Sequence, residues 1–169
     1  PSINNLPPGF LEFIESFFRK ITLKGRNGKG NIFIYSAGND NFVYESYYSG
    51  IYNDINPYFF SQVAFNYYIN TRFTISVGAL NQDLTKSRYS EIGSAILCVG
   101  FGSYDRLVYE DIGITTTYPA VQKLFPVSHR FNGTSAAAPM ISGIISILLQ
   151  YRPDLTWRDV KELISRSCY

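Results

Sequence analysis

The sequence predicts an α/β protein with a mostly parallel sheet flanked by helices. Apolar runs of strand length lie at 31–37, 72–79 and 94–99, and such runs are typical of strands that are buried on both faces of a parallel sheet. Segments with apolar residues at helical spacing precede and follow these runs. Of the 169 residues, 46% are hydrophobic and 17% aromatic, which is enough for one core but not for two. We therefore expect one domain or part of one.

The first helix and the strands can be placed in chain order. Apolar residues at helical spacing follow Pro7-Pro8-Gly9, and the glycine-rich segment 25–30 should end this helix before strand 31–37 begins. The helical pattern consists of Phe10, Ile14, Phe17, Phe18 and Ile21. A weaker strand is expected at 112–117.

Two helices are expected in the C-terminal third. The first begins near Ser135 and ends at Pro153, because proline cannot continue a helix. Its apolar residues Ile141, Ile144, Ile145, Leu148 and Leu149 should face the sheet. In the second helix, Thr156 and Asp159 have the spacing of a capping box. Its inward residues should be Val160, Leu163 and Ile164.

The turn before the first of these helices carries the strongest chemical signal. Residues 132–139 read Asn-Gly-Thr-Ser-Ala-Ala-Ala-Pro. Gly133 allows a tight turn and a close approach of a carbonyl group, and Ser135 lies where a helix begins and backbone N–H groups lack partners. Ser135 is therefore the candidate nucleophile. The alternative is an ordinary helix start rich in small residues.

Strand 31–37 is followed by a second polar signal. The strand ends in Gly38-Asn39-Asp40, and an Asn amide at the carboxyl end of a buried parallel strand is a neutral hydrogen-bond donor that could stabilise an oxyanion. Asn39 is therefore the candidate oxyanion donor. Read alone, Gly-Asn is more often a simple turn, but a nucleophile turn in the same chain favours the catalytic interpretation.

These segments resemble the subtilisin-like serine peptidases, in particular the kexin/furin branch, the proprotein convertases. The resemblance covers nearly the whole chain. Its further matches are Ser16-Phe17-Phe18-Arg19, the Gly-Arg-Asn-Gly-Lys-Gly segment 25–30, Ser36-Ala37-Gly38-Asn39, Tyr89-Ser90-Glu91 and the Leu-Thr-Trp-Arg-Asp-Val segment 155–160.

The resemblance implies a fold, an activity and site residues. The fold is a subtilase-like three-layer sandwich, incomplete here, with 1–169 as the C-terminal portion of the peptidase domain. Ser135 attacks the scissile peptide bond, and the acyl-enzyme forms on it. Asn39 stabilises the oxyanion. The substrate-binding residues implied are Ser36, Ala37, Gly38 and Thr134.

Two members of the catalytic triad are missing from the sequence. In the resembled family the triad Asp and His lie upstream of the region that this chain matches, and no Asp-Ser, Asp-Gly or His-Gly-Thr motif occurs here. Without an imidazole base a serine hydroxyl is a poor nucleophile, so we expect this polypeptide alone to be inactive. His129 lies six residues before Ser135 on the same approach loop and is a conceivable substitute base. The favoured interpretation is a surface or hydrogen-bonded loop histidine at the rim of the cleft. The rival hypothesis is a degenerate, non-catalytic subtilase that binds peptides or partners.

The expectations about calcium binding and about substrate specificity come from the family resemblance alone. Glu91 matches an acidic position linked to calcium in the family, but calcium needs about six to eight oxygen ligands, so Glu91 alone makes no site. Asn66 stands where an acid is expected, which should weaken selection of Arg or Lys. The Tyr- and Asn-rich segment 40–62 is either a substrate-facing insertion or surface filler.

Charge, hydropathy and cysteine content give no indication of nucleic-acid binding, a membrane segment or a disulfide framework. The formal net charge is +2 with interspersed signs, so nothing favours nucleic acid. No apolar stretch of about 18 residues is evident, so we expect no membrane segment. Cys98 and Cys168 are too few to indicate a disulfide framework. The resemblance implies a protein or peptide substrate, an inhibitory propeptide, and a secretory or extracellular location.

Overall fold

The elements follow one another as the sequence predicts, with one additional strand. The computed structural model describes residues 7–41, 66, 68–103, 113–117 and 127–168. In chain order the elements are α1 (Phe10–Lys24), the short 3-10 turn η2 (Gly25–Gly28), β1 (Phe33–Ser36), β2 (Thr74–Leu80), β3 (Ile96–Phe101), β4 (Ile114–Thr117), β5 (Val127–Phe131), α3 (Thr134–Tyr151) and α4 (Trp157–Ser167).

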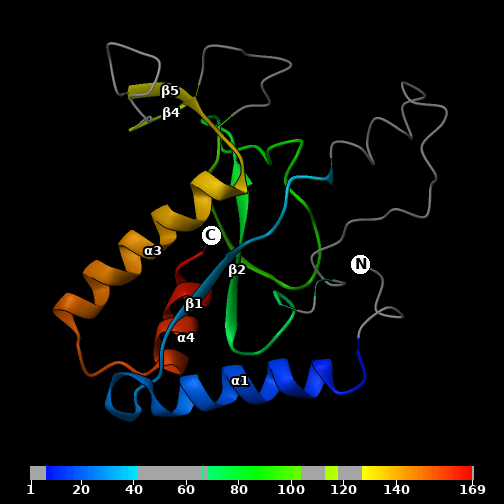
Figure 1. Cartoon of the computed structure of the whole chain (residues 1–169). Coiled ribbons are helices and arrows are strands. Elements are labelled where there is room, and N and C mark those ends of the chain that lie inside the picture. Colours follow the sequence, from blue (N-terminus) through cyan, green and yellow to red (C-terminus); the bar gives the residue numbers. More distant parts are fainter. Residues whose placement is uncertain (1–6, 42–65, 67, 104–112, 118–126, 169) are drawn as a thin grey trace.

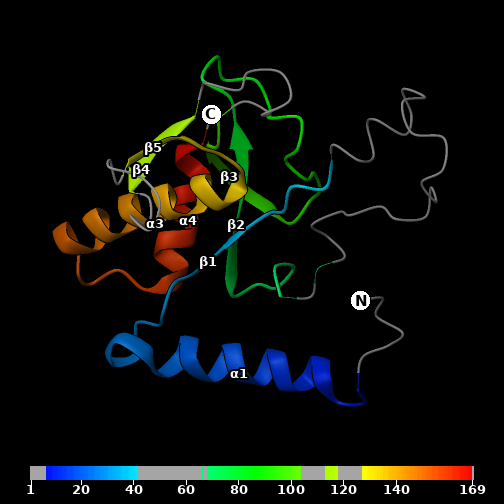
Figure 2. The same cartoon turned by 45° about the horizontal axis from the view of Figure 1, so that its top comes forward.

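Three strands form a parallel sheet in the order β1-β2-β3. Residues that alternate along a strand point to opposite faces. Ile32 and Ile34 pack into the cluster that contains the buried residues of α3 and α4, whereas the rings of Phe33 and Tyr35 lie 5.0 and 6.3 Å from that of Phe18 on α1. The sheet therefore lies between α3 and α4 on one face and α1 on the other, which confirms the three-layer architecture (Figure 1 and Figure 2).

The core lies between the sheet and α3. All of β2 except its last residue is buried, and Val77 and Ala79 are fully inaccessible beside Ala137 of α3. A Cβ atom at Gly100 would lie 3.0 Å from the carbonyl oxygen of Ala137. Small residues on both elements therefore allow the close approach of helix and sheet.

Two inward-facing predictions were wrong, whereas the weaker strand expected at 112–117 is present over 114–117. Ile144 and Leu163 were expected to face inward, but they are 55% and 41% exposed. The strand expected at 112–117 is β4, which pairs antiparallel with β5 outside the main sheet. The sequence did not predict β5, because its residues are almost all exposed and give no pattern of buried positions.

Helix α3 also corrects the hydropathy prediction. Its 18 residues have a mean hydropathy of 1.3, long and apolar enough by composition to cross a membrane. In this structure the helix packs on β1, β2 and β3 and supplies Ala137, Ile141 and Ile145 to the core. These contacts are those of the core helix of a globular domain.

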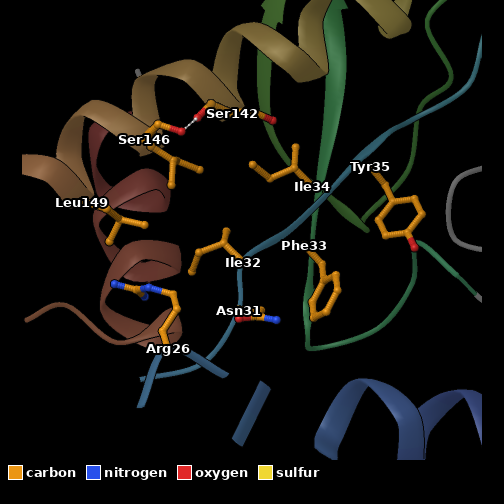
Figure 3. Close-up of a pocket in the computed structure, with 10 residues that line it drawn as sticks. Arg26, Asn31, Ile32, Phe33, Ile34, Tyr35, Ser142, Ser146 and Leu149 are labelled. Atoms are coloured by element: carbon orange, nitrogen blue, oxygen red, sulfur yellow. Dashed lines mark hydrogen bonds between the residues drawn. The ribbon is translucent and has the colours of Figure 1, made fainter. Parts of the chain in front are cut away.

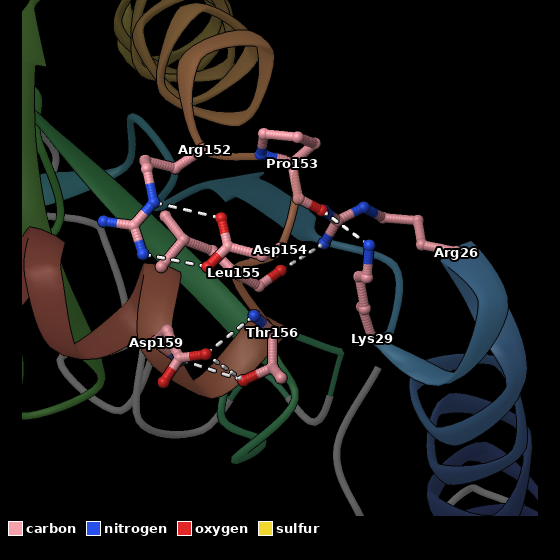
Figure 4. A network of polar contacts seen from close by, with 8 residues as sticks. All are labelled: Arg26, Lys29, Arg152, Pro153, Asp154, Leu155, Thr156 and Asp159. Atoms are coloured by element: carbon pink, nitrogen blue, oxygen red, sulfur yellow. Dashed lines mark hydrogen bonds and ion pairs between the residues drawn. The ribbon is translucent and has the colours of Figure 1, made fainter.

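The capping box of α4 is confirmed and gives a stability prediction. The Thr156 hydroxyl accepts from Asp159 N at 3.3 Å, and Thr156 N donates to the Asp159 carboxylate at 2.7 Å (Figure 4). We expect Thr156→Ala to reduce the free energy of unfolding by about 0.5–2 kcal/mol, because a backbone N–H loses its acceptor. Chemical denaturation measures this change. Ser165→Ala, at an exposed position of the same helix, is the control, and an equal loss in both variants would contradict the assignment.

The loop after α1 is anchored to the connection between α3 and α4. Arg26 donates to the carbonyl oxygen of Leu155 at 3.1 Å, and Lys29 Nζ donates to that of Pro153 at 2.8 Å (Figure 4). The backbone N–H of Trp157 donates in return to the Lys29 carbonyl oxygen at 2.8 Å. These bonds fix the amino ends of β1 and α4 relative to each other.

The two cysteines lie in different environments, which predicts different reactivity. Burial, with a smaller contribution from Cys168, raises the pKa of the Cys98 thiol to about 12, whereas Cys168 is exposed. The thiolate is the reactive form, so we expect iodoacetamide at about pH 8 to alkylate Cys168 first in the folded protein. Mass spectrometry of digested samples measures this order. Equal modification of Cys98 without denaturant would contradict it.

Candidate active site

The candidate site lies where β1 ends and α3 begins. Residues 37–39 follow β1 at the carboxyl edge of the parallel sheet, where the sites of open α/β proteins usually lie. Ala37 N still donates to Val77 O of β2 at 2.9 Å, so this segment leaves the sheet in a defined direction. Three hydrogen bonds then join Gly38 and Asn39 to Thr134, the first residue of α3.

Ser135 is presented to solvent by the first turn of α3. It is exposed, whereas Thr134 and the three alanines 136–138 that follow it are buried. Gly133 has a φ of 99°, a conformation that favours glycine. In the described part of the chain no acceptor receives the Ser135 N–H, as expected for the first turn of a helix. The hydroxyl and this N–H are thus both available to a ligand.

The amide group of Asn39 is held in a single orientation. Its Oδ1 atom accepts from the backbone N–H and from the hydroxyl of Thr134, both at 2.9 Å. The Nδ2 donor is therefore directed away from Thr134, and Asn39 is exposed. A Cβ atom at Gly133 would lie 3.2 Å from Nδ2, so the amide lies against the turn that carries Ser135. The two predicted catalytic residues are brought together.

Thr134 has a role that the sequence did not suggest. Its side chain is fully buried, and its hydroxyl accepts from Gly38 N at 3.2 Å while donating to Asn39 Oδ1. Thr134 therefore holds the Asn39 amide in place. The substrate-binding roles of Thr134, Ser36, Ala37 and Gly38 stay predictions.

Glu91 lies directly behind the end of β1. Its backbone N–H donates to the Gly38 carbonyl oxygen at 3.1 Å, and the residue is only 6% exposed. A side chain on Gly38 would overlap the Glu91 carboxylate, so glycine is required there. Among the described residues, no group of three or more His, Cys, Asp or Glu side chains could hold a metal ion. Calcium at Glu91 stays a prediction.

Asn66 begins a tight turn. Its Oδ1 atom accepts from Tyr68 N at 3.1 Å, and its carbonyl oxygen accepts from Ile69 N and Asn70 N. Apart from Asp40 and Asn41, the segment 40–62 lies outside the described residues, and so does its predicted role.

His129 is placed on a strand and not on the approach loop. It is an exposed residue of β5, and its Nδ1 atom lies 2.9 Å from the Thr115 hydroxyl of β4. No contact between His129 and Ser135 occurs in the described part of the chain. The cross-strand bond favours a structural role over that of a base.

A separate hollow of about 570 Å³ lies between β1 and α3. Ile32, Ile34, Ile145 and Leu149 form much of its apolar lining, with Arg26 at one end (Figure 3). None of the predicted site residues line it, and it opens along the middle of α3 rather than at its first turn. It does not belong to the candidate active site.

Comparisons with known proteins give matches over most of the chain. The subtilase family model (peptidase S8) matches residues 8–168. The chain is 33% identical over 142 residues to human proprotein convertase subtilisin/kexin type 7, and the match covers 84% of this chain and 16% of that protein. It is 35% identical over 141 residues to the dibasic-processing endoprotease of Yarrowia lipolytica, covering 82% and 12%.

A solved structure shows the same fold. The serine protease of Aeromonas sobria superposes with a TM-score of 0.72 at 24% identity, and the match covers 100% of this chain and 31% of that protein. This chain therefore spans less than a fifth of the two sequence relatives above and about a third of the solved protease.

Proposed function

Because the chain belongs to the subtilase family, we propose that it supplies the nucleophile and the oxyanion donors of a serine endopeptidase. Ser135 is the nucleophile, and its own N–H and Asn39 Nδ2 are the donors. The observation that carries the proposal is the pair of 2.9 Å bonds from Thr134 to Asn39 Oδ1. These bonds leave the amide nitrogen free beside the serine turn, with no reorganisation needed during the reaction.

The proposed reaction proceeds through an acyl-enzyme. The Ser135 oxygen attacks the carbonyl carbon of the peptide bond, and the carbonyl oxygen becomes an oxyanion that accepts from the two donors. The C–N bond then breaks, the amine leaves with a proton, and water hydrolyses the ester on Ser135. A general base must accept the hydroxyl proton. We assign this base, with its orienting carboxylate, to polypeptide outside residues 1–169, so this chain alone is expected to be inactive.

The proposed substrates are proproteins cleaved after basic residues. The relatives are named as a proprotein convertase and a dibasic-processing endoprotease, and Glu91 places a buried carboxylate behind Gly38. Asn66 supplies no negative charge, so we expect weaker discrimination for basic residues than two carboxylates would give. By the same family resemblance we propose calcium near Glu91, an inhibitory propeptide and a secretory location.

A panel of fluorogenic peptides tests this function. The full-length protein that contains this chain is assayed on matched peptides with Arg, Lys, Leu or Glu before the scissile bond, with and without a calcium chelator. We expect cleavage of the Arg and Lys peptides, and loss of that cleavage on chelation. Equal cleavage of all four peptides would contradict the specificity but not the peptidase activity.

A further inference from the structure

We propose that Tyr89 is a positioning residue that holds the serine turn and the Asn39 loop in register with each other. The inference rests on the proposed peptidase function and adds a residue to its machinery. Tyr89 lies between the two segments that carry the oxyanion donors, and it makes hydrogen bonds to both of them through different atoms.

The hydroxyl of Tyr89 contacts the serine turn. It accepts from Gly133 N at 3.2 Å, and it lies 2.5 and 2.8 Å from the carbonyl oxygens of Gly102 and Ser103, to either of which it can donate. Gly133 N also donates to Gly102 O at 2.9 Å. Tyr89 is buried, at 7% exposure. Its hydroxyl and the Gly102 carbonyl oxygen together anchor the turn before Ser135 to the residues that follow β3.

The backbone around Tyr89 contacts the Asn39 loop. The carbonyl oxygen of Tyr89 accepts from Asn41 N at 3.3 Å, and that of Arg88 accepts from Asn41 Nδ2 at 3.0 Å. On the other side of Asn39, Gly38 O accepts from Glu91 N at 3.1 Å. The residues on both sides of Asn39 are therefore held by backbone atoms of Arg88, Tyr89 and Glu91, while the Tyr89 hydroxyl contacts the serine turn.

The Tyr89 hydroxyl lies in a closely packed part of the backbone. A Cβ atom at Gly102 would lie 2.6 Å from the Tyr89 oxygen and 2.9 Å from Gly133 O, so the backbone is already in close contact around it. Removing the hydroxyl deprives Gly133 N of one of two acceptors. Because the bond to Gly102 O remains, we expect the turn to shift rather than to unfold, and the Ser135 N–H to lose alignment with the oxyanion.

Tyr89→Phe in the full-length protein tests this role. We expect kcat to fall about tenfold and KM to stay within about twofold, because the oxyanion exists only in the transition state. A peptide boronate, which forms a tetrahedral adduct on serine, should bind about tenfold more weakly. An unchanged kcat, or a change confined to KM, would overturn the proposal.

The matched control is Ser90→Ala, which removes a neighbouring buried hydroxyl. Ser90 Oγ accepts from Ala79 N at 3.0 Å, and within the described residues its hydrogen bonds do not involve the serine turn. We expect it to lower the melting temperature while kcat stays within about twofold. An equal loss of kcat in both variants would show that Tyr89 acts only through general stability, and would also overturn the proposal.

A second variant covers the case in which Tyr89→Phe does not fold, and the wild-type assays distinguish this inference from the proposed function. If Tyr89→Phe does not fold, 3-fluorotyrosine at position 89 keeps the hydroxyl as a weaker acceptor and should lower kcat about twofold; an unchanged kcat would count against the proposal. A wild-type protein that neither cleaves peptides nor binds the boronate would overturn the proposed function together with this inference. An active wild type with an equally active Tyr89→Phe variant would overturn this inference alone.

Discussion

We expect the replacement of Ser135 by alanine to remove nearly all of the proposed peptidase activity from the full-length protein. The expected fall in kcat is on the order of 10⁶-fold, the size measured for loss of the nucleophile in subtilisin, a member of the same family. The reason is that no acyl-enzyme can form without the hydroxyl. Binding of peptide should change little, because Ser135 is exposed and alanine fits the first turn of α3.

The control for this variant is Ser146→Ala. Ser146 is also an exposed serine of α3, and its hydroxyl donates to the Ser142 carbonyl oxygen at 2.8 Å. Initial rates on one fluorogenic peptide compare the two variants with the wild type. Substantial activity in Ser135→Ala at an unchanged melting temperature would place the nucleophile elsewhere.

Asn39→Ala should produce the second largest effect. We expect kcat to fall about 10²- to 10³-fold, again the size measured for the oxyanion amide in subtilisin. KM should remain close to that of the wild type, because the Asn39 amide stabilises charge that develops only in the transition state. Part of the loss arises because the two Thr134 donors lose their shared acceptor.

Gln82→Ala is a suitable control because it removes an exposed amide outside the candidate site. Steady-state kinetics over a range of peptide concentrations separate kcat from KM for both variants. A rise in KM with an unchanged kcat would show that Asn39 binds the ground state of the substrate, and the oxyanion role would then be wrong.

Local sequence patterns indicate candidate site residues but not the contacts that position them. Ser135 and Asn39 are candidates because each lies in a short segment whose local pattern, a helix start or a strand end, carries the signal, and their catalytic roles stay predictions. The hydroxyl of Thr134 could not be assigned in this way, because its partners Gly38 and Asn39 are more than 90 residues away in the chain. Tyr89 was only a family match until its hydroxyl was placed beside Gly133.

The fold shows the same difference between local and long-range information. Strand β2 was predictable because its continuous apolar run is buried on both faces. Strand β5 pairs with β4 at an exposed position, where the hydrophobic pattern carries no information. Ile144 was expected to face the sheet because it shares the helical spacing of Ile141 and Ile145. Of these three residues, Ile141 and Ile145 are buried in the core, whereas Ile144 is exposed.

Fluorophosphonate labelling of the full-length protein tests the central proposal most directly. The probe modifies a serine only when a base and oxyanion donors activate it. We expect one label per molecule, located by mass spectrometry on Ser135 and absent from Ser135→Ala, and labelling should be slow in Asn39→Ala. A folded full-length protein in which Ser135 remains unlabelled would contradict the peptidase assignment and favour a subtilase domain that binds peptides without cleaving them.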